Sequence, residues 1–124
     1  GAVITRSRKP VQDQTMRVDN TKAQMRKGVL EYCILGTLSQ GELYPSDIIG
    51  KLKDAKLIVV EGTLYPLLTR LKDAGLLTYR WEESRSGPPR KYYTLTPVGT
   101  KFLNELDQEW DELMQAVKKT TRRK

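Results

Sequence analysis

Histidine is absent from the 124 residues of this sequence, and cysteine occurs once, at Cys33. Without histidine, the commonest metal ligand and the commonest general base are missing. A single cysteine cannot form a disulfide within the chain. No paired nucleophile and base, metal cluster or phosphate-binding loop is visible in their place. We therefore expect no catalytic site, no metal site and no cofactor, and a protein that is not an enzyme.

Long apolar runs are also scarce, and acidic residues are fewer than basic ones. No run approaches the roughly 18 apolar residues of a membrane-spanning helix, and the N-terminal residues contain no secretory apolar block. We expect a cytoplasmic protein of one-domain size with no membrane partner. Lys and Arg number 22 against 15 Asp and Glu, which gives a net charge of +7. This excess predicts an anionic partner, of which nucleic acid is one candidate.

A predicted recognition helix begins near residue 63. Four leucines at three- and four-residue spacing share one helical face, which leaves the other face free. These leucines are Leu64, Leu67, Leu68 and Leu71. Pro66 falls early in the helix and cannot donate to the carbonyl four residues before it, so the helix starts near Thr63 or is opened in its first turn. This end then keeps unpaired backbone N–H groups, which suit phosphate oxygens.

A β-hairpin with a cationic tip is predicted directly after this helix. Gly75 is a typical helix stop, and the apolar residues that follow alternate with polar ones at the period of a half-buried strand. These are Leu77, Tyr79 and Trp81. A second strand is expected at 91–95, and the link 84–90 carries two arginines and no acid. Within this link, Gly87-Pro88-Pro89 predicts a stiff turn that cannot pair as a ladder.

The residues before the recognition helix predict an N-terminal arm, two helices and a short connector. Residues 1–19 show no periodicity and are expected to form a flexible basic arm, whose leading Gly1 is typical of a cleaved tag. Asp19, Asn20 or Thr21 can cap a first helix that runs to about Ser39. A second helix is expected from Pro45 to Ala55. The apolar connector 56–60 can form a small strand or plug the core, and both alternatives stay open.

The C-terminal part predicts one long helix at 97–119, followed by a basic tail at 120–124. Thr96 supplies a cap and Pro97 the first helical position. The apolar residues keep a three-four-three-four spacing, which is typical of a helix that packs against another helix. They are Leu103, Leu106, Trp110, Leu113 and Val117. We expect these residues to form a dimer interface, and burial against the chain's own first helix is the alternative.

The elements together predict a mostly helical α+β fold with a small β-hairpin. The order of helix, strand, basic turn and strand is that of a winged helix-turn-helix with a recognition helix and a wing. We expect residues 20–96 to form the DNA-binding domain and 97–119 to form a dimerisation helix.

Two segments resemble the signature segments of PadR-type transcriptional regulators: GTLYPLLTRLKDAGLL at 62–77 and GPPRKYYTLT at 87–96. The segment LYPSDI at 43–48 is similar to the Tyr-Gly-x-Asp-Ile start of their second helix, with Pro45 in place of the usual glycine. The resemblance covers about residues 25–119. It implies a dimeric winged-helix DNA-binding protein, usually a bacterial repressor released by small molecules. The single C-terminal helix resembles the small subfamily that includes the lactococcal multidrug-responsive regulator.

The DNA-contact candidates lie on the predicted recognition helix, on the wing and at two positions before them. Thr63 and Tyr65 are the candidates for base edges, Arg70 is expected to meet phosphate, and a partly buried core position is the alternative for Tyr65. Tyr44 follows from the resemblance. The full set is Lys27, Tyr44, Gly62, Thr63, Tyr65, Pro66, Thr69, Arg70, Arg85, Gly87, Arg90 and Lys91.

These observations lead to a hypothesis about function. We expect a homodimeric transcriptional repressor that places two recognition helices in successive major grooves of an inverted repeat operator in double-stranded DNA. A planar aromatic effector is expected to relieve repression by binding at Trp110 and Met114. The resemblance supplies Trp110 as a ligand-binding position, and simple packing is the alternative. A regulator without a ligand, or a winged-helix protein-interaction module with an acidic partner, are the competing hypotheses.

Overall fold

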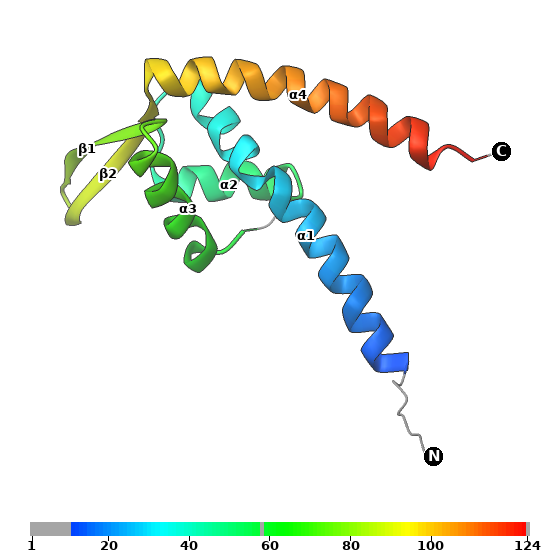
Figure 1. Cartoon of the computed structure of the whole chain (residues 1–124). Coiled ribbons are helices and arrows are strands. Elements are labelled where there is room, and N and C mark those ends of the chain that lie inside the picture. Colours follow the sequence, from blue (N-terminus) through cyan, green and yellow to red (C-terminus); the bar gives the residue numbers. More distant parts are fainter. Residues whose placement is uncertain (1–10, 58, 124) are drawn as a thin grey trace. The chain divides into compact units, whose positions relative to one another are not determined.

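The computed structural model describes residues 11–57 and 59–123, with side chains from residue 17 onward. It is mostly helical with one antiparallel hairpin, so the predicted fold class is confirmed. The chain divides into two compact units, Gly1–Leu30 and Glu31–Lys124. Figure 1 labels its elements, which are α1 (Val11–Thr37), η2 (Leu38–Gln40), α2 (Pro45–Asp54), α3 (Glu61–Asp73), β1 (Leu77–Ser84), β2 (Gly87–Leu95) and α4 (Pro97–Thr121).

The first helix begins earlier than its sequence predicts. The cap was expected at residues 19–21, yet α1 starts at Val11. No glycine or proline occurs between Val11 and Gly28, and the glutamine, methionine and arginine residues of this stretch favour helix. The flexible arm predicted for residues 1–19 is therefore wrong from Val11 onward, and its residues 1–10 lie outside the described part of the chain.

The core of the second unit is built from leucine and isoleucine side chains of four helices and the hairpin. Three of the four leucines predicted to face the core from α3 are buried, and Leu67 is half-buried. In the connector, Val59 is buried and neither it nor Leu57 lies in a strand, so the connector plugs the core at Val59. The most deeply buried side chains are Ile34, Leu35, Ile48, Leu52, Leu64 and Leu68.

The hairpin is longer, and its turn tighter, than predicted. Its ladder runs from Leu77↔Leu95 to Glu82↔Arg90, and the register then shifts before Ser84↔Gly87. The turn is therefore the short segment 85–86, and the predicted seven-residue link at 84–90 is wrong. Pro88 and Pro89 lie inside β2, between its paired positions 87 and 90, where two residues oppose one on β1. Proline has no N–H to donate, and a bulge in a two-stranded sheet tolerates this.

The start of α4 is fixed by a network of backbone contacts. Thr96 caps the helix as predicted, because its Oγ1 accepts from the N–H of Gly99 at 2.9 Å and donates to the carbonyl of Gly75 at 2.6 Å. The N–H of Thr96 also donates to the carbonyl of Leu76 at 3.1 Å. Gly99 packs so closely on Leu76 that a Cβ at this position would overlap the carbonyl oxygen. Glycine is therefore required at position 99 for α4 to approach the link between α3 and β1 this closely.

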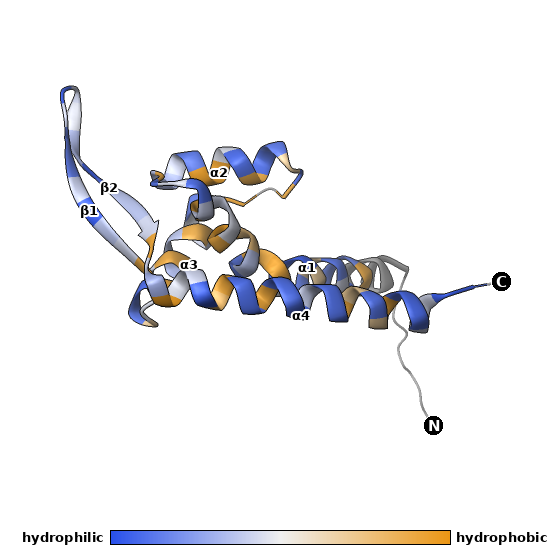
Figure 2. Ribbon diagram, turned by 90° about the horizontal axis from the view of Figure 1, so that it is seen from above, coloured by the Kyte–Doolittle hydropathy of each residue, from blue (hydrophilic) through white to orange (hydrophobic). Residues whose placement is uncertain are grey.

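The described helices include none that is both long and apolar enough to cross a membrane. Figure 2 shows why for α4, whose ribbon alternates hydrophilic and hydrophobic bands along its length. Most of the hairpin is hydrophilic in the same view.

Candidate nucleic-acid interface

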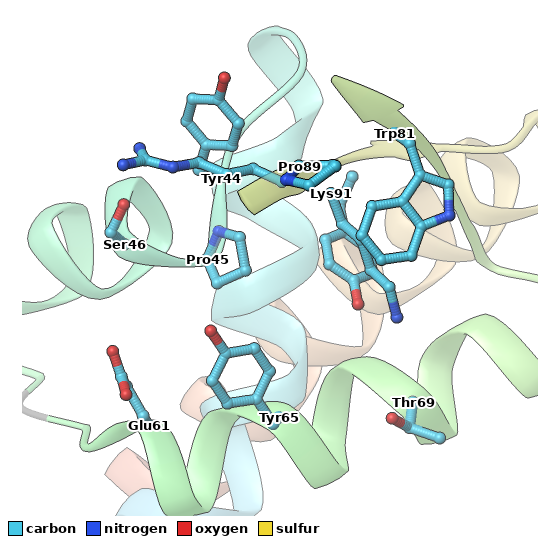
Figure 3. A pocket seen from close by; sticks show the side chains of 11 residues that line it. Tyr44, Pro45, Ser46, Glu61, Tyr65, Thr69, Trp81, Pro89 and Lys91 are labelled. Atoms are coloured by element: carbon cyan, nitrogen blue, oxygen red, sulfur yellow. The ribbon is translucent and has the colours of Figure 1, made fainter. Parts of the chain in front are cut away.

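A groove of about 450 Å³ lies where the start of α2, one face of α3 and the hairpin meet. Figure 3 shows the side chains that project into it from these three elements. The residues that line it are Tyr44, Pro45, Ser46, Glu61, Tyr65, Thr69, Trp81, Pro89, Arg90, Lys91 and Tyr93. An isolated bridge fixes one wall, since Leu43 and Tyr93 exchange backbone hydrogen bonds of 3.1 and 2.9 Å. The segment before α2 is thereby attached to β2.

The helix α3 supplies the floor of the groove. Its leucine face is buried, and the opposite ridge of Glu61, Tyr65 and Thr69 repeats every four residues, so these side chains lie one above another along the groove. Tyr65 is 46% exposed, which excludes a core role. In Figure 3 its side chain points from α3 toward Pro45 at the start of α2. The ridge can therefore reach an extended ligand laid along the groove.

The N-terminus of α3 adds backbone donors. The helix begins at Glu61, two residues before the predicted start at Thr63, and it contains Pro66. The N–H groups of Thr63 and Leu64 donate to the carbonyl of Val60 at 2.9 and 3.0 Å. Those of Glu61 and Gly62 have no acceptor among the described residues. Backbone donors at the positive end of a helix suit anionic oxygens.

The hairpin carries cations of two kinds. Arg80 forms a bidentate ion pair with Glu42, at 2.8 and 3.0 Å, and a second pair with Glu82 at 3.2 Å. These hydrogen bonds hold the pKa of Arg80 above its usual value and that of Glu42 below it. By contrast, three cations near the tip have no carboxylate partner within residues 17–57 and 59–123: Arg85, Arg90 and Lys91. Arg80 therefore stabilises the fold through its ion pairs, and the three cations near the tip can bind an external anion.

A stack of alternating cations and rings fixes the hairpin against α2. The Tyr44 and Tyr92 rings stack at 3.8 Å between centroids with 19° between planes. Arg80 covers the Tyr92 ring at 4.8 Å, and Arg90 lies 5.3 Å from the centroid of Tyr44. The hydrogen bond with Tyr44 raises the pKa of Tyr92 to about 12. Tyr44, predicted as a phosphate contact, thus also positions Arg90 over the groove.

The predicted DNA-contact residues fall into two groups of five, and Arg70 and Lys27 are treated singly. Some line the groove: Tyr44, Tyr65, Thr69, Arg90 and Lys91. Others are exposed on α3 or near the hairpin tip without lining it: Gly62, Thr63, Pro66, Arg85 and Gly87. Arg70 is exposed, but its Nε lies 3.3 Å from a buried oxygen of Glu31, an ion pair without hydrogen-bond alignment. Lys27 is exposed on α1 in the first unit. Contact of all these residues with DNA stays a prediction.

Six groove residues were not among the predicted DNA contacts: Pro45, Ser46, Glu61, Trp81, Pro89 and Tyr93. Glu61 could have been found, because it lies four residues before Tyr65 and hence on the same helical face. Trp81 was assigned to a half-buried strand, yet it is 60% exposed. Its alternation with Leu77 and Tyr79 gave the correct face, but the hairpin extends beyond the core (Figure 1), so the end of that face meets solvent.

The predicted dimer residues of α4 differ in how far a single chain already buries them. Leu103 is only 8% exposed and belongs to the core of its own chain, whereas Leu113 and Val117 are 47% and 48% exposed. Leu106, Trp110 and Met114 are half-buried. Of the predicted dimer residues, those near the C-terminal end of α4 are therefore the most exposed.

Trp110 is partly covered by the last turns of α1. Its ring lies 6.2 Å from that of Tyr32 at an angle of 44°. The hydroxyl of Tyr32 donates to Oδ1 of Asp107 at 2.6 Å, and this bond raises the pKa of Tyr32 to about 12. Packing within one chain thus covers one side of the Trp110 side chain, and the part that is still exposed can contact a partner or a ligand.

Comparison with known proteins identifies the family. The model of the transcriptional regulator PadR-like family matches residues 34–105. A PadR-like transcription factor from Bacteroides fragilis is 61% identical, and the match covers 82% of this chain and 99% of that one with a TM-score of 0.71. A PadR family regulator from Eggerthella lenta is 30% identical, with 91% and 99% covered and a TM-score of 0.82.

One further relative was solved with a ligand. The structure of Bacillus subtilis PadR in complex with operator DNA is 34% identical, with a TM-score of 0.59, and the match covers 63% of this chain and 46% of that one. This chain therefore spans about half the length of that relative, which is described as a negative transcriptional regulator. With 72 residues of the chain inside the family match and related structures covered almost completely, the protein belongs to the PadR-like family of transcriptional regulators.

Proposed function

We propose that the protein is a homodimeric DNA-binding repressor that acts in the cytoplasm, with residues 20–96 as its DNA-binding domain and 97–119 as its dimerisation helix. The observation that carries the proposal is the exposed ridge of α3 beside three hairpin cations that have no carboxylate partner among the described residues. The operator complex and the repressor role of Bacillus subtilis PadR support it.

The ridge of α3 fits the major groove by size and by chemistry. An α-helix with its side chains is about 10 to 12 Å across, and the major groove of B-DNA is about 12 Å wide. Tyr65 and Thr69 can contact base edges or a thymine methyl, and Glu61 can accept from the N4 of cytosine. Arg85, Arg90 and Lys91 supply phosphate contacts, so affinity falls steeply with salt.

Selection of bound duplexes from a random pool, followed by fluorescence anisotropy, tests this function. We expect an inverted repeat whose half-sites are about 34 Å apart, because a twofold dimer presents its two recognition helices to successive major grooves on one side of the DNA. Binding without sequence preference would contradict the proposal and favour a protein-interaction module with an acidic partner.

The exposed stripe of α4 supports dimerisation through this helix. We expect Leu113→Glu to weaken the dimer by about a hundredfold, because it introduces an unpaired carboxylate into an apolar contact on both subunits. Sedimentation equilibrium at micromolar concentration measures the effect. Gln115→Glu adds the same charge at an exposed position of α4 and should leave the dimer intact. A monomeric parent protein, or equal loss in both variants, would contradict the assignment.

A small effector is the remaining part of the proposed function. A planar aromatic cation is the expected class, because Trp110 offers a ring and Asp107 and Asp111 lie on the same helix. In a Trp81→Phe background, such compounds should quench Trp110 fluorescence in a saturable way and weaken DNA binding. A ligand acts only through its preference for the conformation that does not bind DNA. Absence of saturable quenching would leave Trp110 and Met114 with a packing role alone.

A further inference from the structure

Trp81 is a large apolar side chain that the core does not explain. It is 60% exposed on β1, and its indole borders two separate hollows. One is the groove above α3, where Figure 3 shows Trp81 extending from the hairpin on the side of Thr69. The other, of about 570 Å³, is lined by Trp81, Glu83, Pro88 and Pro89. An exposed aromatic of this kind is usual where a surface meets a partner.

The indole is held in place by its neighbours rather than left free. The ring of Tyr79 meets it edge-on, at 6.0 Å between centroids and 89° between planes. Lys91 is its cross-strand partner, and the Nζ atom lies 5.3 Å from the Trp81 ring and 4.4 Å from that of Tyr79. Little conformational entropy is therefore lost when a ligand packs on the indole.

The charges around Trp81 favour an anionic partner. Lys91 and Arg90 border the same groove, and Arg85 lies at the hairpin tip, all without carboxylate partners among the described residues. Two acids are also present, since Glu61 lies at the start of α3 and Glu83 borders the outer hollow. A surface that alternates an apolar ring with cations matches a DNA backbone, in which the apolar C–H face of each deoxyribose alternates with phosphate.

We propose that Trp81 packs against a deoxyribose of the DNA strand that borders the major groove read by α3, between phosphates held by Arg90 and Lys91. This inference rests on the proposed DNA-binding function and adds a contact to it. Such a contact reads no base, so it strengthens binding to every sequence to the same degree. Because it involves no charge, it contributes nothing to the salt dependence of affinity.

Anisotropy titrations of Trp81→Ala and Trp81→Phe, on the selected duplex and on a scrambled one at several salt concentrations, test the proposal. We expect Trp81→Ala to lose about tenfold in affinity for both duplexes with an unchanged salt slope, and Trp81→Phe to recover much of the loss. Lys91→Ala is the contrasting variant, since removal of one phosphate contact lowers the salt slope by about one. In a Trp110→Phe background, the fluorescence of Trp81 should change when DNA is added.

Four results would overturn the inference. They are unchanged affinity of Trp81→Ala, a loss confined to the selected duplex, a reduced salt slope, and Trp81 fluorescence that DNA does not alter. The fluorescence measurement needs no change at Trp81, so it decides the matter even if an alanine variant folds poorly. Failure of the parent protein to bind any duplex would remove the proposed function together with this contact, whereas the first four results leave DNA binding itself standing.

Discussion

The combined variant Thr63→Ala, Tyr65→Ala, Arg90→Ala is expected to lose about a thousandfold in affinity for the selected duplex. Each base contact contributes about 1 to 3 kcal/mol of discrimination, and the arginine adds a phosphate contact. Tyr65 and Arg90 line the groove, and Thr63 is exposed on the first turn of α3, so none of the three supports the core. Anisotropy at fixed salt measures the loss, and circular dichroism checks the fold.

A matched control separates local contacts from net charge. Lys53→Ala removes one cation from the exposed end of α2, as Arg90→Ala does from the hairpin, without touching the groove lining. We expect it to change affinity by less than about threefold, since a distant charge is largely screened at physiological salt. If the combined variant still binds the selected duplex like the parent protein, α3 and the hairpin are not the DNA-reading surface.

Gly99→Ala is expected to lower the free energy of unfolding by about 2 to 3 kcal/mol and the melting temperature by roughly 10 °C. The new Cβ would overlap the carbonyl oxygen of Leu76 and lie 2.9 Å from its carbonyl carbon. Because both atoms belong to backbone, and the Leu76 carbonyl also accepts from Thr96, the strain cannot be relieved by rotating a side chain. Thermal and urea denaturation measure the change.

Gly50→Ala provides the control for this stability effect. Gly50 also lies in a helix, but a Cβ there would meet nothing within 4 Å. Alanine favours helix over glycine by up to about 1 kcal/mol, so this variant should be as stable as the parent protein or more stable. Equal stability of Gly99→Ala and the parent protein would mean that α4 does not approach Leu76 closely.

Local patterns predicted much of the fold and part of the site. The spacing of the leucines identified the buried face of α3, and Thr96-Pro97 identified the start of α4, because capping and periodicity depend on residues only a few positions apart. The same period placed Tyr65 and Thr69 on the free face of the helix. The start of α1 and the length of β2 were predicted less well, since weak helix preferences and a proline bulge leave no sharp local signal.

The sequence by itself determined the family, the order of the elements and which face of each is apolar, because these follow from neighbouring residues along the chain. Only the tertiary structure decided which arginine forms an ion pair within the fold. Arg80 pairs with Glu42, which is far away in sequence, whereas the guanidinium of Arg90 lies over the ring of Tyr44. It also decided that Trp81 is exposed, because strand alternation fixes a face but not how far that face extends beyond the core. Contacts between distant residues depend on where the whole chain places them, and no local pattern encodes that position.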